Sequence, residues 1–111
     1  MEPTYPFITG QTATTATIDK TILDTVVTAA GYVYTPTATD THEKIMAALL
    51  LGLTVQATRA LYDEDVNRSI FVEPGTIARS TTKSGVTDSP LYLLEQLTVN
   101  FSSRGINPDL Y

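Results

Sequence analysis

The stretch IMAALLLGLTVQATRAL, residues 45–61, decides the fold of this chain. Immediately before it, Asp40-Thr41-His42-Glu43 places an acidic residue three positions ahead of a glutamate. This spacing is the capping-box pattern of a helix start. We therefore predict a helix from about residue 41 to residue 65.

The middle of this helix is apolar almost all the way round. Leu49, Leu50 and Leu51 follow one another, so their side chains point about 100° apart. An ordinary surface helix has one apolar stripe and one polar face, and a chain of this length buries only about two-thirds of its unfolded surface. We expect part of the helix to pack against another copy or another protein, with Gly52 allowing close approach.

A first helix is predicted N-terminal to this one. From Ile18 the apolar residues fall at 18, 22, 23, 26, 27 and 30, which is the spacing of one helical stripe. Thr17 is placed to cap this helix and Gly31 to end it. The β-branched composition opposes a helix, but the segment lacks the alternation of a strand.

Residues 1–17 contain two prolines, one glycine and six threonines, and they are expected to form an extended arm. The arm is either a frayed terminus or a contact segment that lies across a neighbouring subunit. In the second case Tyr5, Phe7 and Ile8 are the anchors, because prolines and β-branched residues lower the entropy cost of ordering the chain.

The C-terminal part is predicted to contain strands and turns. Ser69-Ile70-Phe71-Val72 has the composition of a strand, and Glu73-Pro74-Gly75-Thr76 that of a type II turn. The remaining expectations are a second strand at 76–79, a loop at 83–89, a helical turn or strand at 90–96, a strand at 97–102, and a polar tail at 103–111. The whole is one α+β domain, residues 18–102, with two helices followed by a small antiparallel β segment.

Charge and composition exclude several classes of function. The net charge is −5, and the arginines are scattered, so nucleic acid is not an expected partner. The longest apolar run, between Lys44 and Arg59, has 14 residues, against about 20 for a membrane span. Met1-Glu2-Pro3-Thr4 lacks the basic and apolar regions of a secretory signal. We expect a soluble protein made in the cytoplasm.

No group of residues predicts a catalytic, cofactor or metal site. A calcium loop starting at Asp63 would need glycine at its sixth position and glutamate at its twelfth, where the chain has Arg68 and Pro74. The carboxylates 63–65 are then a solvated helix end, an incidental cation site, or partners for a neighbour's arginine. His42 is the only histidine and is expected at the surface.

The chain has 20 threonines and no cysteine. Threonine keeps strand edges soluble without charge, or gives a flat β surface that recognises sugars or proteins. The chain resembles small structural proteins of tailed bacteriophage virions. The resemblance rests on this composition and on the layout of the chain, with the arm at 1–17, the apolar helix at 45–61, the hairpin-like segment at 69–82 and the tail at 103–111.

The resemblance implies a protein that works through repeated contacts between copies. A head-to-tail connector of the adaptor kind under the portal, or a capsid decoration protein, fits this description. Its partners are then further copies and the portal, capsid or tail proteins, and its location is the virion. The alternative is a small dimeric binding or regulatory module. The expected interface residues are Tyr5, Phe7, Ile8, Leu49, Leu50, Leu51, Leu53, Ile106, Leu110 and Tyr111.

Overall fold

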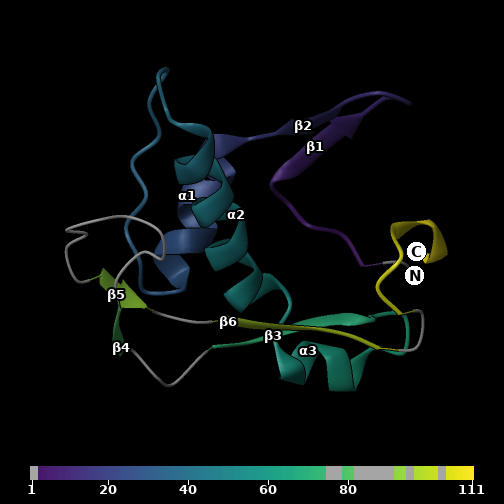
Figure 1. Cartoon of the computed structure of the whole chain (residues 1–111). Helices are drawn as coiled ribbons and strands as arrows, with labels where there is room; N and C mark the ends of the chain where they lie inside the picture. The colour runs from purple at the N-terminus through teal and green to yellow at the C-terminus, as the bar shows by residue number, and fades with distance from the viewer. Residues whose placement is uncertain (1–2, 75–78, 82–91, 95–96, 103–104) are drawn as a thin grey trace.

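A computed structural model describes residues 3–74, 79–81, 92–94, 97–102 and 105–111. The fold is mixed α+β, as expected (Figure 1). The described elements, in chain order, are β1 (Ile8–Gln11), β2 (Ala16–Ile18), α1 (Lys20–Ala29), α2 (His42–Gln56), α3 (Arg59–Glu64), β3 (Ile70–Pro74), β4 (Arg79–Thr81), β5 (Tyr92–Leu94), β6 (Leu97–Phe101) and the 3₁₀ turn η1 (Pro108–Leu110).

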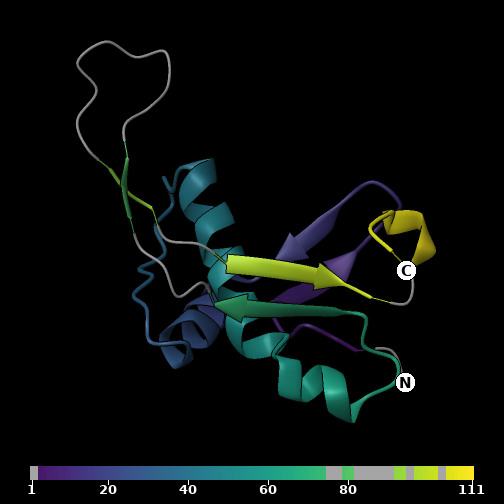
Figure 2. The same ribbon diagram turned by 60° about the horizontal axis from the view of Figure 1, so that its bottom comes forward.

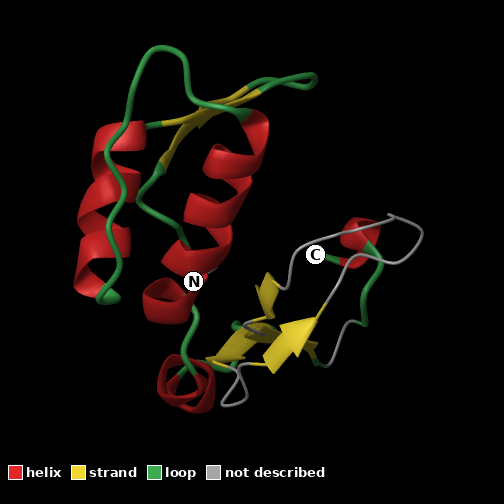
Figure 3. Cartoon of the chain, turned by 60° about the vertical axis from the view of Figure 1, so that its left-hand side comes forward, coloured by secondary structure: helices red, strands yellow, loops and turns green. Residues whose placement is uncertain are grey.

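The expected extended arm at 1–17 is wrong for its second half. Here β1 and β2 form an antiparallel hairpin, in which Gln11 pairs with Ala16. Thr12 closes the turn, because its amide donates to the Thr15 carbonyl at 2.8 Å and its hydroxyl bonds that of Thr15 at 2.7 Å. The hairpin projects from the helices, as Figure 3 shows in yellow.

Helix α1 begins two residues later than expected. Asp19, not Thr17, is the N-cap, and its Oδ1 accepts the amides of Thr21 and Ile22 at 2.9 and 3.0 Å. A carboxylate accepts two orphan amides there and also suits the positive end of the helix dipole. The predicted end of the helix at Gly31 is confirmed, since Gly31 follows the C-cap residue with a φ of 91°.

The long helix expected at 41–65 is two helices. α2 is capped by Thr41 rather than Asp40 and ends at Gln56, and α3 starts after a second threonine cap, Thr58, whose Oγ1 accepts the Leu61 amide. The break lets α3 turn under β3 (Figure 2). Where two helices were predicted, the described residues therefore form three α-helices.

The strands pair differently from the expected local hairpin. β3 pairs with β6, and β4 with β5, both antiparallel. The strand predicted at 97–102 is confirmed, and Tyr92–Leu94 is a strand rather than a helical turn. The second strand predicted at 76–79 coincides with the described residues only at Arg79, and the loop at 83–89 lies outside them.

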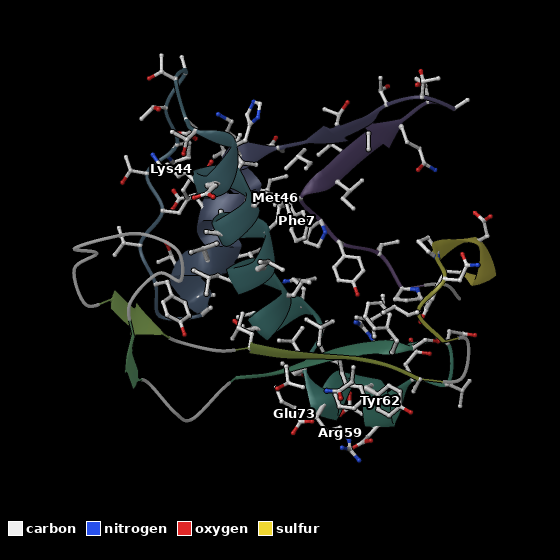
Figure 4. All side chains as sticks on the ribbon, viewed as in Figure 1. Phe7, Lys44, Met46, Arg59, Tyr62 and Glu73 are labelled. Atoms are coloured by element: carbon white, nitrogen blue, oxygen red, sulfur yellow. The ribbon has the colours of Figure 1, made fainter. Side chains whose placement is uncertain are left out.

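The fully buried core lies among the N-terminal elements. α1 packs beside α2, and Phe7 is wedged against this helix pair, as the labelled side chains in Figure 4 show. The core residues are Phe7, Leu23, Val26, Val27, Tyr34 and Ala48. A smaller buried group under the β3–β6 sheet consists of Ala57, Ser69, Phe71 and Val72.

Candidate assembly surface

The outer face of α2 carries exposed apolar side chains. Met46 is 54% exposed and Leu50 44%, and they lie one helical turn apart with the exposed Ala47 beside them. The opposite face of the helix, around Ala48 and Gly52, is buried against α1. We call Met46, Ala47 and Leu50 the α2 outer face.

The leucines of α2 are divided between core and surface. Leu49, Leu51 and Leu53 are partly buried and pack against the core of the same chain, whereas Leu50 faces outward. Gly52 also faces inward, because a Cβ placed there would lie 3.2 Å from Cδ1 of Leu23. The expected close approach at Gly52 is thus made within the chain.

The three residues expected as N-terminal anchors, Tyr5, Phe7 and Ile8, differ from one another in burial. Phe7 is only 3% exposed and belongs to the core of its own chain, so its expected role as an anchor on a neighbour is wrong in this structure. Ile8 is 47% exposed. Tyr5 is half-buried, and burial raises its pKa, while the charge of Arg68 opposes that rise.

The two ends of the described chain meet at one small cavity. Its volume is about 220 Å³. The residues that line it are Pro3, Tyr5, Asn67, Arg68, Ser69, Ile70 and Tyr111. Tyr111 also packs edge-on against Phe101 and donates its hydroxyl to the Gly105 carbonyl at 2.5 Å, while Ile106 is 75% exposed. The side chain of Leu110 lies outside the described part.

The buried carboxylate of Asp40, which the sequence pattern predicted only as a helix cap, organises the starts of α1 and α2. Lys44 and Thr37 donate to Oδ1 of Asp40 at 2.8 and 2.6 Å, and Lys20 and Tyr34 donate to Oδ2 at 3.1 and 2.9 Å. These bonds, from Lys44 first, hold the pKa of Asp40 well below its ordinary value. Burial, reinforced by Asp40, raises the pKa of Tyr34 to about 12.

The Asp40 carboxylate has no room for a further ligand. The Thr37 amide also donates to Oδ1, at 3.1 Å, so five donors share about four lone-pair sites. Its side chain is fully enclosed. The arrangement fixes the loop between α1 and α2 and leaves no lone pair for proton transfer or metal binding at this carboxylate.

Two of the acidic residues at 63–65 also have partners within their own segment of the chain. Asp63 pairs with Arg59 at 3.2 Å, and Asp65 accepts the Asn67 amide at 2.9 Å. Arg59 lies over the rings of Tyr62 and Phe71; Figure 4 labels Arg59 and Tyr62 on α3. Within the described residues no three His, Asp or Glu side chains gather as a metal ion would require. His42 is exposed at the start of α2.

None of the described helices has the length and apolar character needed to cross a membrane. Comparisons with protein-family models, with curated proteins and with solved structures find no match to this chain.

Proposed function

We propose that this chain is a non-enzymatic structural protein that assembles into a symmetric homo-oligomer through the α2 outer face. We place it in a tailed-phage virion, as a connector of the adaptor kind at the head-to-tail neck. The observation that carries the assembly role is the exposure of Met46 and Leu50 on a helix whose opposite face is already buried. A surface helix normally carries polar residues at such positions.

The surface area of the chain supports the same role. The chain exposes 8105 Å². A compact monomer of 12.0 kDa exposes about 6,000 Å². Its radius of gyration, 16.1 Å, also exceeds the roughly 13 Å of a compact domain of this length. The shape of the chain therefore leaves more surface open to contacts between copies than a compact domain of this length would have; a standard contact covers about 800 Å² per partner.

Light scattering coupled to gel filtration tests the proposal, with Leu50→Lys as the variant. The wild-type chain is expected to elute as a closed oligomer, and the variant as a monomer with an unchanged circular dichroism spectrum. Burying one leucine contributes about 1.5–3 kcal/mol, so each contact weakens by about ten- to a hundredfold. Leu51 is less suitable, because it packs against the core.

Thr21→Lys is the matched control, since Thr21 is exposed on α1, away from the α2 outer face. The control should assemble as the wild type does. A wild-type chain that stays monomeric at all concentrations contradicts the proposal, and so does a Leu50→Lys chain that assembles normally. A trimer would favour capsid decoration, and a stable dimer the binding or regulatory module.

A further inference from the structure

The cavity between the N-terminal segment and the start of β3 has no part in the proposed assembly. Its volume is about 220 Å³, roughly that of seven water molecules. Pro3 and Tyr5 line it from the N-terminal segment, and Asn67–Ile70 from the turn that leads into β3, together with Tyr111. No residue of the α2 outer face lines it. Three segments far apart in the sequence thus meet at one place with room for a small molecule.

Arg68 brings a positive charge to this cavity. Its Nη1 donates to the Gln56 carbonyl at 2.8 Å, which ties the guanidinium to the end of α2. A guanidinium carries several N–H donors, and within the described residues Arg68 makes only this one side-chain hydrogen bond and no ion pair. Lys20, Lys44 and Arg59, by contrast, are all paired with carboxylates. Arg68 therefore has donors left for the anion of a ligand.

Two tyrosine rings form walls that are in place before a ligand binds. The ring of Tyr5 packs against that of Phe7, a core residue, with 5.9 Å between the centroids. The ring of Tyr111 packs edge-on against Phe101 at 6.3 Å. Burial raises the pKa of Tyr5 and the charge of Arg68 opposes that rise, so the phenol and the guanidinium are close enough to interact. The Tyr5 phenol stays protonated at neutral pH and is a second donor to an anion.

The lining combines a polar segment with apolar and aromatic residues. The polar segment is Asn67–Ser69, which is fixed at its end because the Ser69 carbonyl accepts the Ser102 amide at 2.8 Å. The apolar and aromatic residues are Pro3, Tyr5, Ile70 and Tyr111. Ligand sites are mostly apolar, with a few polar groups that fix the orientation of the ligand. This lining fits a small ligand with an apolar ring and one charged end.

The surroundings of Arg68 favour a ligand with a single negative charge. Arg68 also lines a second hollow, where its neighbours include Asp63 and Asp65. The chain has a net charge of −5, so a phosphate group, with about two charges, meets more repulsion than a carboxylate. A carboxylate also accepts parallel hydrogen bonds from the two arms of a guanidinium.

We propose that this cavity binds a ring-bearing monocarboxylate, with its carboxylate on Arg68 and its ring against Tyr5 and Tyr111. The site is a binding function separate from assembly, and it does not depend on the oligomeric state. A free aromatic acid and the carboxyl end of a peptide with an aromatic last residue both present these two groups.

Saturation-transfer NMR tests the site, because it observes ligand protons and works for a monomer and for an assembly alike. The probes are benzoate, benzyl alcohol and acetate at one ionic strength. We expect benzoate to bind in the millimolar range that is usual for so small a ligand. Benzyl alcohol lacks the charge and acetate lacks the ring, so each should bind at least about tenfold more weakly. N-acetyl-phenylalaninate is the probe for a peptide end, and the tighter of it and benzoate identifies the source.

Variants of the two arginines locate the carboxylate. Arg68→Gln removes the charge and should weaken benzoate binding at least about tenfold, while Arg68→Lys, which keeps the charge, should weaken it less. Arg59→Gln is the matched control, since Arg59 pairs with Asp63 and does not line the cavity. Circular dichroism establishes that each variant is folded. If Arg68→Gln does not fold, the comparison of probes on the wild-type chain decides.

Three results overturn the proposal. They are equal binding of benzoate and benzyl alcohol, displacement of benzoate by an equal concentration of inorganic phosphate, and unchanged benzoate binding in a folded Arg68→Gln chain. A chain that assembles by light scattering but does not bind benzoate also overturns the site and leaves the assembly role standing. A monomeric chain that binds benzoate supports the site and contradicts the assembly role alone.

Discussion

At the scale of single residues, Asp40 has a different role from the one that the sequence predicts. The sequence pattern made Asp40 a helix cap, but Thr41 caps α2 and Asp40 turns inward to bind Lys20, Tyr34 and Lys44. The error has a physical reason. Aspartate and threonine both serve as N-caps, and the tertiary positions of Lys20 and Lys44 determine that Asp40 turns inward while Thr41 caps the helix.

Removal of the Asp40 charge should destabilise the chain strongly. Asp40→Asn leaves two partly exposed ammonium groups without their anion and weakens the acceptor of the buried Tyr34 hydroxyl, and loss of the partner of a buried polar group is costly. We expect the melting temperature at pH 7 to fall by roughly 5 to 10 °C in a domain of this size. Asp63→Asn, in a pair whose side chains are 59% and 58% exposed, should change it by far less.

The contribution of Asp40 to stability should depend on pH in a defined direction. The folded chain lowers the pKa of Asp40 below its ordinary 3.8, so the stabilisation is complete above that value and decreases as the pH falls below it. The wild-type melting temperature should therefore decline between pH 5 and pH 2 more steeply than that of Asp40→Asn. Parallel curves for the two chains would show that Asp40 does not contribute in this way.

At the scale of elements, the sequence predicts where helices exist better than where they end. The apolar stripe from residue 18 and the apolar run at 45–61 both belong to helices. The break after Gln56 was missed, because no glycine or proline marks it. Its only local signal is Thr58, which is a favourable N-cap residue. Threonine also has a lower helix propensity than alanine, so it favours a helix end over a helix interior.

Strand pairing was the least predictable part of the chain. The β1–β2 hairpin has a turn of threonine and alanine, without the Asn-Gly or Gly-Gly signal of tight hairpins. The pairing of β3 with β6 joins residues more than twenty positions apart, and sequence periodicity carries no information on such a partner. Of the α2 leucines expected at an interface, Leu50 is exposed, whereas the others pack against the core of the chain. The exposure of Met46 was not predicted, because the three consecutive leucines dominated the pattern.

The contact between α1 and α2 depends on Gly52. A Cβ there already comes within 3.2 Å of Leu23, which is fully buried, so Gly52→Val forces the two helices apart. We expect urea denaturation to show a loss of about 1–3 kcal/mol of unfolding free energy. Gly52→Ala should cost less, since the gain in helix propensity of about 1 kcal/mol opposes the crowding.

Ala47→Val is the control for Gly52→Val, because Ala47 is exposed on the same helix. It measures the intrinsic helix cost of valine, roughly 0.5 kcal/mol. At position 52 valine replaces glycine, so helix propensity alone would stabilise Gly52→Val by roughly 0.5 kcal/mol. A Gly52→Val chain that loses no unfolding free energy would mean that the tight helix contact at Gly52 is absent in solution.

At the scale of the whole molecule, charge is distributed unevenly along the chain. Residues 1–66 carry eight acidic and three basic side chains. Those three bases, Lys20, Lys44 and Arg59, are all paired within the chain, with Asp40 and Asp63. Copies that meet through their N-terminal halves therefore repel each other at long range, and the apolar contact must overcome that repulsion.

Salt should consequently strengthen assembly. The Debye length falls from about 30 Å at 0.01 M to about 10 Å at 0.1 M ionic strength, which screens the repulsion and leaves burial of the α2 outer face unchanged. Light scattering at these two ionic strengths should show a several-fold tighter association at the higher one. Weaker association at the higher ionic strength would instead indicate a contact between opposite charges.

Helix α2 packs on α1 along one part of its length and meets β3 near its end, where the Val72 amide donates to the Ala57 carbonyl at 2.8 Å. In Figure 1 the hairpin and the β4–β5 pair extend from it in opposite directions. A subunit that is bound through the outer face of α2 is thus held near its middle. If the proposed ring forms, the two ends of each subunit extend away from the contact, so a small tilt of each subunit about α2 would change the diameter of the ring opening without breaking the contact.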